Sequence, residues 1–194
     1  MDVKKSYPGQ GFGWGNLSSN NRGFTLIELF VTLAVVSILG ASIFPNLSAL
    51  VAQERSTVLI NNLAGALAYA RSEAVMRNTE ILTCQSNNSS ECNRSKNWQN
   101  GWIIFVDNNK NRQRDPEEKL LRVYSAVENG TQAIFNGASR IDHYMRYKPS
   151  GRAYPNGSFR ICNPNIGIGK ALIMTQSGRL RLSKIDTHGH TITC

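Results

Sequence analysis

A run of 21 residues, Phe24 to Phe44, constrains this chain more than any other feature, because it carries a single charged side chain, Glu28. About 20 apolar residues in a helix span the hydrocarbon core of a membrane. We therefore predict a transmembrane helix over residues 24–44. Arg22 stands just before the run, which predicts a cytoplasmic N-terminus and a C-terminal bulk on the far side of the membrane.

Glu28 needs an explanation, since a carboxylate inside an apolar helix costs roughly 2.5–3.5 kcal/mol unless it has a partner. Cleavage of the chain after Gly23 would create such a partner, because the new amine on Phe24 could lie beside Glu28 of a neighbouring helix. The alternative is that Glu28 reaches from the helix end to the membrane interface.

The segment RGFTLIEL, residues 22–29, resembles the processing site of type IV prepilins and pseudopilins. The resemblance implies a leader, residues 1–23, that a prepilin peptidase removes between Gly23 and Phe24. It also implies that Phe24 is N-methylated and that Glu28 guides docking onto other pilins of a filament. The protein is then expected in the inner membrane, with a periplasmic C-terminal domain, before assembly and in an extracellular pilus afterwards.

The rest of the chain predicts an α+β fold. Pro45 lacks a backbone N–H and is expected to kink or break the first helix. Apolar residues then recur at helical spacing from Leu59 to Ala74, which predicts a helix to about residue 78 whose stripe packs on a sheet. Eight short strand-like runs follow: 81–84, 102–106, 120–124, 131–135, 141–147, 158–162, 171–175 and 180–185. The domains are therefore the leader, a helix over 24–78 and a β-rich domain over 79–194.

Three later stretches, residues 101–122, 148–162 and 175–184, resemble the GspH/FimT branch of minor pilins and pseudopilins. Together with the leader and the apolar run, the resemblance covers most of the chain. It implies a long N-terminal helix packed on a β-sandwich of two small sheets, which agrees with the strands predicted here.

Four cysteines, an even number, favour disulfides in a domain outside the cytoplasm. Three pairings are possible. We prefer Cys84 with Cys92, which closes a short polar loop, and Cys162 with Cys194, which ties the last residue to the domain. Zinc is the competing interpretation, but the sequence has no C-x-x-C pair.

We predict no metal, no cofactor and no enzymatic activity. One stretch matches positions 1, 3, 5 and 12 of an EF-hand calcium loop, through Asp107, Asn109, Asn111 and Glu118. However, Arg112 stands where that loop needs glycine, and Lys110 and Arg114 add positive charge. A hairpin turn is therefore favoured. His188 and His190 lack an evident third ligand. No hydrolase, metalloprotease or nucleotide-binding motif occurs.

Positive charge is concentrated at the C-terminal end, because residues 24–139 sum to zero whereas residues 140–194 hold nine basic residues against two aspartates. Strand alternation places Arg179 and Arg181 on one face, about 6.6 Å apart, where guanidinium groups could grip successive phosphates. The candidate DNA-binding residues are Arg146, Lys148, Arg152, Arg179, Arg181 and Lys184. Tyr144, Tyr147 and Tyr154 are candidates for stacking on bases.

Two functions remain open. The FimT branch is associated with DNA uptake in natural transformation, and the G-R-x-R segment resembles its DNA-binding tail. A minor type IV pilin that binds DNA without sequence preference is therefore our first hypothesis. The alternative is a structural minor pseudopilin of a type II secretion system, or an initiator of pilus assembly, in which these arginines meet carboxylates of neighbouring subunits.

Overall fold

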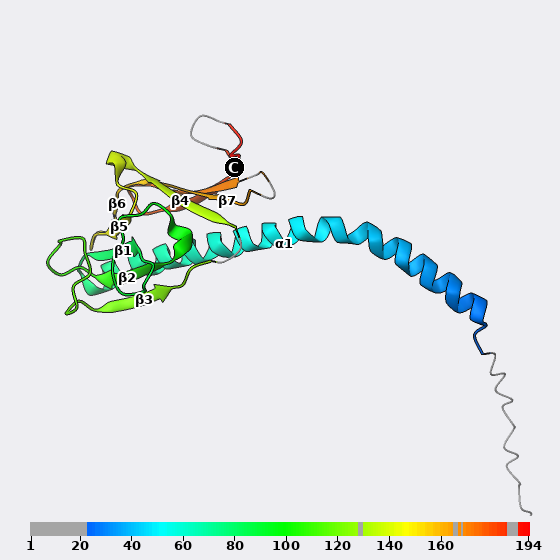
Figure 1. The fold of residues 1–194 in the computed structure, drawn as a ribbon. Helices are drawn as coiled ribbons and strands as arrows, with labels where there is room; N and C mark the ends of the chain where they lie inside the picture. The colour runs from blue at the N-terminus through cyan, green and yellow to red at the C-terminus, as the bar shows by residue number, and fades with distance from the viewer. Residues whose placement is uncertain (1–22, 128–129, 165–166, 168, 186–189) are drawn as a thin grey trace, which may run out of the picture. The chain divides into compact units, whose positions relative to one another are not determined.

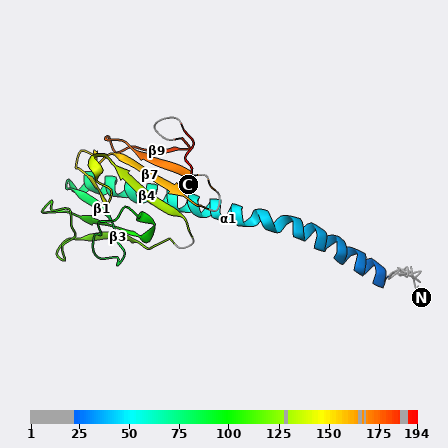
Figure 2. The same ribbon diagram turned by 45° about the horizontal axis from the view of Figure 1, so that its top comes forward.

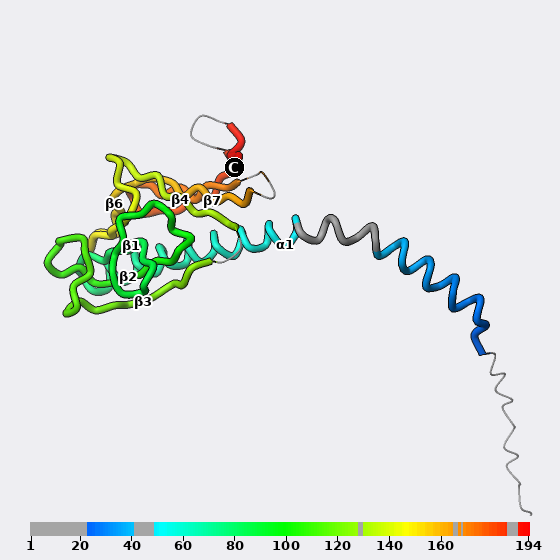
Figure 3. Tube along the Cα trace, viewed as in Figure 1, coloured from blue at the N-terminus to red at the C-terminus, as the bar shows by residue number. Residues whose placement is uncertain are grey.

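A computed structural model describes residues 23–127, 130–164, 167, 169–185 and 190–194, with only the backbone for residues 41–48. Figure 3 draws the remaining parts, and also residues 41–48, in grey. The chain divides into two compact units, Met1–Ile43 and Phe44–Cys194. Residues 1–22 of the predicted leader, and His188 of the histidine pair, lie outside the described residues.

One helix, α1, extends from Leu26 to Arg77. It ends where predicted, because Asn78 adopts a positive φ of 52° that turns the chain out of the helix. Of the kink or break predicted at Pro45, the break is wrong, since the helical backbone continues through this residue; one missing N–H removes only one bond of the helical ladder. Within the described residues, no helix has both the length and the apolar character that a membrane crossing requires. The transmembrane assignment of residues 24–44 stays a prediction.

Nine strands form two antiparallel sheets in the described residues (Figure 1). The first sheet has the order β3-β2-β1-β5-β6 and consists of β1 (Ile81–Gln85), β2 (Trp102–Val106), β3 (Leu120–Tyr124), β5 (Tyr144–Tyr147) and β6 (Ala153–Tyr154). The second has the order β4-β7-β8-β9 and consists of β4 (Gln132–Gly137), β7 (Gly157–Cys162), β8 (Gly169–Met174) and β9 (Leu180–Ser183). The turned view separates the two sheets (Figure 2).

The α+β prediction is confirmed, and all eight predicted runs contain a strand. The run 141–147 was predicted too long, because a short 3-10 helix, Ala138–Arg140, turns the chain before it and β5 begins only at Tyr144. The two-residue strand β6 was missed. It pairs with β5 through Arg146 and Tyr147, and a strand of that length has no sequence periodicity to detect.

The main core joins the helix to both sheets, which confirms the predicted stripe. Leu59, Leu63 and Leu67 of α1 are fully buried in the same cluster as residues of both sheets. A second 3-10 helix, Trp98–Asn100, supplies the central aromatic side chain. The Trp98 ring meets Phe159 edge-on, with ring centroids 5.0 Å apart, and its indole N–H donates to the Asp142 carbonyl at 3.0 Å.

The outer face of the first sheet carries a smaller core of its own. It comprises Leu82, Cys84, Ile103, Phe105 and Tyr144, with Cys92, Leu120 and Ile141 packed against them. Since both faces of β1 and β2 are buried, these strands are nearly continuously apolar in sequence rather than alternating.

Both preferred disulfides form. Cys84 bonds to Cys92 and fastens the loop over the smaller core. Cys162 at the end of β7 bonds to Cys194, and the Gly169 N–H donates to the Ile192 carbonyl at 2.7 Å beside it. The C-terminal residues therefore pack on the end of the second sheet.

Candidate nucleic-acid interface

The predicted processing site precedes the first turn of α1. Gly23, Phe24 and Thr25 lie just outside the helix, and the Phe24 side chain is 81% exposed. The Thr25 hydroxyl accepts a hydrogen bond from the Glu28 backbone N–H at 3.3 Å. Thr25 and Glu28 thus have the spacing of a capping box, and a carboxylate in a first turn is favoured by the helix dipole. This local role of Thr25 was missed from the sequence.

Two turns with the same sequence triplet form the centre of the basic region. Ser150-Gly151-Arg152 follows β5, and Ser177-Gly178-Arg179 joins β8 to β9. In the first turn, the Lys148 N–H donates to the Arg152 carbonyl at 2.9 Å; in the second, the Thr175 N–H donates to the Arg179 carbonyl at 3.0 Å. Both glycines have positive φ, +73° and +77°, which glycine adopts without strain.

The two turns pack against each other. A Cβ on Gly178 would lie 2.3 Å from the Gly151 carbonyl oxygen, so only glycine permits this approach. The Gly151 carbonyl also accepts a hydrogen bond from Nε of Arg71, on α1, at 3.1 Å. Arg71, Arg179 and both glycines line a cavity of about 630 Å³. The contact places Arg152 and Arg179, each of which directly follows its glycine, at one end of the two sheets.

Arg146 differs from the other candidate residues because it already has a carboxylate partner. Its Nη1 lies 2.9 Å from Oε2 of Glu80, and its guanidinium carbon lies 5.2 Å from the centre of the Tyr154 ring. Arg146, Lys148 and Arg152 line a cavity of about 420 Å³. Within this group, Arg146 is therefore held in place while Lys148 and Arg152 are exposed.

The remaining candidates lie on and after β9, the edge strand of the second sheet. Arg181 pairs with Ile173 of β8, whereas Leu180 and Leu182 pair with Met174 and Leu172 and lie on the opposite face. Arg181 and Lys184 are exposed. Arg160 of β7 is also exposed and was not among the predicted residues, because a single arginine within a strand gives no sequence signal.

The prediction of base-stacking tyrosines is wrong for two of the three. Tyr147 is fully buried, and its hydroxyl donates to the sulfur of Met174 at 3.4 Å. Burial raises the pKa of its phenol well above the usual value, although the positive charge of Arg71 opposes this. Tyr144 belongs to the smaller core. The burial of Tyr144 and Tyr147 could not be predicted, because the sequence alone does not show which faces of β5 are covered.

The exposed basic residues are electrostatically unsatisfied. Lys148, Arg152, Arg179, Arg181 and Lys184 form no ion pair with any carboxylate of the described residues. A surface of this kind attracts polyanions. Within the same residues, no three His, Cys, Asp or Glu side chains are grouped closely enough to hold a metal ion.

Comparison with known families decides the identity. The family described as Type II transport protein GspH matches residues 59–179, well over half of the chain. The chain belongs to the GspH family. The prokaryotic N-terminal methylation motif matches residues 18–44, which include the predicted cleavage site between Gly23 and Phe24. The GspH-family chain is thus a type IV minor pilin or pseudopilin of the GspH/FimT type, and a membrane-anchored precursor and assembly with other pilins follow from that family.

A solved structure of a minor pilin shares the fold of this GspH-family chain. The type IV minor pilin FimU of Pseudomonas aeruginosa, strain PAO1, is 21% identical over 68% of this chain and 90% of that chain, with a TM-score of 0.50. The minor pseudopilin EpsH from the Type 2 Secretion System of Vibrio cholerae is 10% identical over 66% and 95% of the two chains, with a TM-score of 0.47. A comparison with curated protein sequences found no match.

Proposed function

We propose that this minor pilin binds DNA without sequence preference and promotes DNA uptake in natural transformation. The paired S-G-R turns and β9 present the binding surface, with Lys148, Arg152, Arg179, Arg181 and Lys184 as the residues that contact phosphates. Arg146 contributes as part of the cavity wall, since its guanidinium is already paired with the Glu80 carboxylate.

The observation that supports this proposal most is the close packing of the two turns. It brings Lys148, Arg152 and Arg179 to one end of the sheets without any described carboxylate paired to them. Like charges repel, so a chain gathers them at one place mainly when an anion binds there. Phosphates contacted by arginine give charge-assisted bonds that depend on backbone charge rather than on base sequence.

The test is the salt dependence of DNA binding by residues 51–194, which retain every described core residue of α1 from Ala52 onward. Fluorescence anisotropy with a labelled duplex and with a single strand would be measured over a series of salt concentrations. Each lost phosphate contact should reduce the slope of log K against log salt by about 0.9 for a duplex. We expect Arg152→Gln/Arg179→Gln, and separately Arg179→Gln/Arg181→Gln, to reduce it by about 1–2.

A control with the same net charge separates a local site from general attraction. Arg94→Gln/Lys119→Gln removes two exposed basic side chains that belong to neither the turns nor β9. This control should leave the slope near the wild-type value. Equal losses in control and test variants would reduce the proposal to nonspecific attraction, and absence of binding by the wild type at low salt would refute it.

We also propose that the N-terminal motif is processed as the family implies. A prepilin peptidase would cut between Gly23 and Phe24, Phe24 would be N-methylated, residues 24–44 would hold the protein in the inner membrane, and Glu28 would guide assembly. The exposed position of Phe24, directly before the helix, supports access to this bond. Intact-mass analysis of protein from the native host tests it, since an uncleaved N-terminus would contradict it.

A second candidate function is a structural minor pseudopilin of a type II secretion system, which the description of the matching family favours. In that case the same basic residues would face carboxylates of sister pseudopilins. Loss of protein secretion on deletion, together with DNA binding no stronger than that of the control variant, would support this alternative.

A further inference from the structure

The loop between β2 and β3, Asp107–Glu118, has acidic and amide side chains at the spacing of an EF-hand calcium loop. The sequence alone disfavours a calcium site here, because Arg112 occupies the position of the glycine. The structure removes the objection, because Arg112 has φ +66° and therefore adopts the left-handed conformation that this glycine normally supplies. The Arg112 side chain is exposed.

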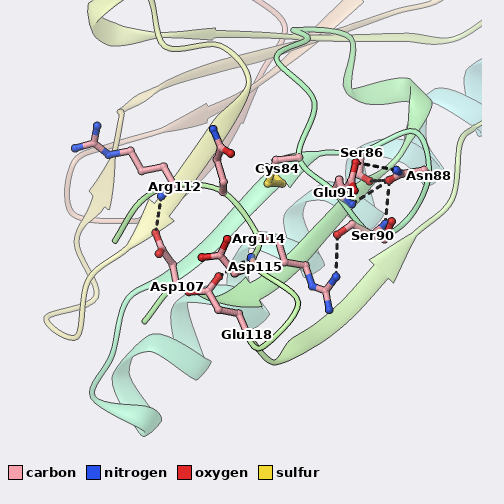
Figure 4. Close-up of a disulfide and its surroundings, with 12 residues drawn as sticks. Cys84, Ser86, Asn88, Ser90, Glu91, Asp107, Arg112, Arg114, Asp115 and Glu118 are labelled. Atoms are coloured by element: carbon pink, nitrogen blue, oxygen red, sulfur yellow. Dashed lines mark hydrogen bonds between the residues drawn. A yellow bond between two sulfur atoms is a disulfide. The ribbon is translucent and has the colours of Figure 1, made fainter. Parts of the chain in front are cut away.

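One buried carboxylate in the loop has an oxygen without a partner. Asp107 is 0% exposed, and its Oδ2 accepts a hydrogen bond from the Arg112 backbone N–H at 3.2 Å (Figure 4). Its Oδ1 is also buried but has no hydrogen-bond partner. A buried carboxylate oxygen that no donor satisfies is costly, and such oxygens are normally paired or bound to a metal ion.

A second carboxylate lies close to Asp107. Glu118 is 5% exposed, and its two oxygens accept hydrogen bonds only from backbone N–H groups, those of Asn108 at 2.8 Å and Asp115 at 3.2 Å. The negative charge of Glu118 lies near enough to Asp107 to repel it. The two acidic side chains thus repel each other in a partly water-excluded place.

The basic side chains of the loop do not neutralise these carboxylates. Lys110 and Arg112 are exposed and form no ion pair with the described residues. The Arg114 guanidinium is directed to the neighbouring disulfide loop, where Nη1 donates to the Ser90 carbonyl at 3.0 Å (Figure 4). The positive charges that argued against a cation site in the sequence are therefore not paired with the carboxylates of the loop.

We infer that the loop Asp107–Glu118 binds a calcium ion, with the unpartnered Oδ1 of Asp107 and the Glu118 carboxylate as its charged ligands. Asp115 stands at the ninth position, and its Oδ2 receives hydrogen bonds from the side-chain amides of Asn109, at 2.6 Å, and Asn111, at 2.8 Å. The amide oxygens of Asn109 and Asn111, which now accept hydrogen bonds from the backbone N–H groups of Asn111 and Gln113, would be further neutral ligands.

Calcium suits this set of donors better than other metals. The described residues contain no group of three or more His, Cys, Asp or Glu side chains placed to hold a metal ion, so an ion in this loop would draw most of its ligands from neutral oxygens. Calcium accepts six to eight oxygens, including amide and backbone carbonyl oxygens, such as that of Gln113 at the seventh position. With only two carboxylates as charged ligands, the affinity should lie in the weak range of extracellular modules, a Kd of about 10⁻⁴–10⁻³ M.

The test is calorimetric titration of the full chain, in detergent micelles and stripped with EDTA, with Ca²⁺ and separately with Mg²⁺. The test variant is Glu118→Gln, which keeps the shape of the side chain but removes one charge and replaces one of its two acceptor oxygens by an NH2 group. Glu117→Gln is the matched control, because Glu117 is exposed and its replacement removes the same charge from the adjacent position. Near-UV circular dichroism verifies that each variant is folded, and thermal unfolding of the wild type with and without Ca²⁺ gives a readout independent of the variants.

We expect one Ca²⁺ per chain, a higher unfolding temperature with Ca²⁺ than with Mg²⁺, and roughly tenfold or greater weakening by Glu118→Gln. Glu117→Gln should change the affinity by no more than about twofold. No saturable binding by the wild type up to about 10 mM Ca²⁺ would overturn the inference. Equal weakening in both variants would also overturn it, since the attraction would then be a general effect of charge.

Discussion

Replacement of Gly178 by alanine tests whether the contact between the two turns organises the basic surface. Gly178 has φ +77°, and a Cβ there would meet the Gly151 carbonyl oxygen at 2.3 Å and the Arg71 Nε at 3.1 Å. The first of these is a backbone atom held by its own turn, so it cannot rotate away. Gly178→Ala should therefore push the two turns apart.

The loss of folding stability caused by Gly178→Ala has two parts, and a replacement at a second glycine measures one of them alone. Alanine in a left-handed conformation costs about 1–2 kcal/mol, and overpacking adds about 1–3 kcal/mol. Gly130 has nearly the same φ, +78°, but a Cβ added there would meet no described atom within 4 Å. Gly130→Ala should carry the first cost alone, so the variants should differ by about 1–3 kcal/mol.

Urea denaturation of residues 51–194, followed by tryptophan fluorescence, measures both variants against the wild type. A difference of 1 kcal/mol corresponds to about 2–4 °C in Tm for a domain of this size. Gly178→Ala should also weaken DNA binding more than Gly130→Ala does, because Arg152 and Arg179 lose their common position. Equal destabilisation by the two variants would refute the steric argument.

Three further predictions follow from other contacts. Cys162→Ala/Cys194→Ala should cost about 3–4 kcal/mol in urea unfolding, because the bond closes a sequence separation of 32 residues, and a loss below about 1 kcal/mol would contradict this. The folded-state pKa of Tyr147 is raised, so its phenol keeps the proton at pH values where the unfolded chain loses it. The free energy of unfolding should therefore fall as the pH rises through about 10. Tyr147→Phe should show a smaller fall between about pH 9 and 11. Glu80→Gln should cost about 1–3 kcal/mol in the same assay at neutral pH, since it leaves the half-buried Arg146 guanidinium without its carboxylate.

The sequence predicted the strands and disulfides better than the contacts between distant residues. The strands Trp102–Val106 and Leu120–Tyr124 have the predicted bounds, because turn-forming residues flank them on both sides. The even cysteine count and the short polar loop led to the right disulfides. Local chemistry settles such features, so no knowledge of distant contacts is needed.

Features that depend on contacts between distant residues could not be predicted. Glu80 and Arg146 are 66 positions apart, so their pairing, which removes one candidate DNA contact, required knowledge of the register between β1 and β5. The burial of Tyr144 likewise depends on a second core on the outer face of a sheet. The repeated S-G-R triplet was visible in the sequence, but its meaning came only from the contact between Gly151 and Gly178.

The buried stripe of α1 has a mechanical consequence. Leu59 and Ala74, both 0% exposed, mark its ends, so the embedded length is about 22 Å at the rise of an α-helix. Tension along the helix axis would load all of these contacts together in shear, instead of peeling them apart one at a time. Extraction of the helix then requires the whole close-packed interface to slip at once. A subunit pulled through its helix should therefore resist force far better than its modest size suggests.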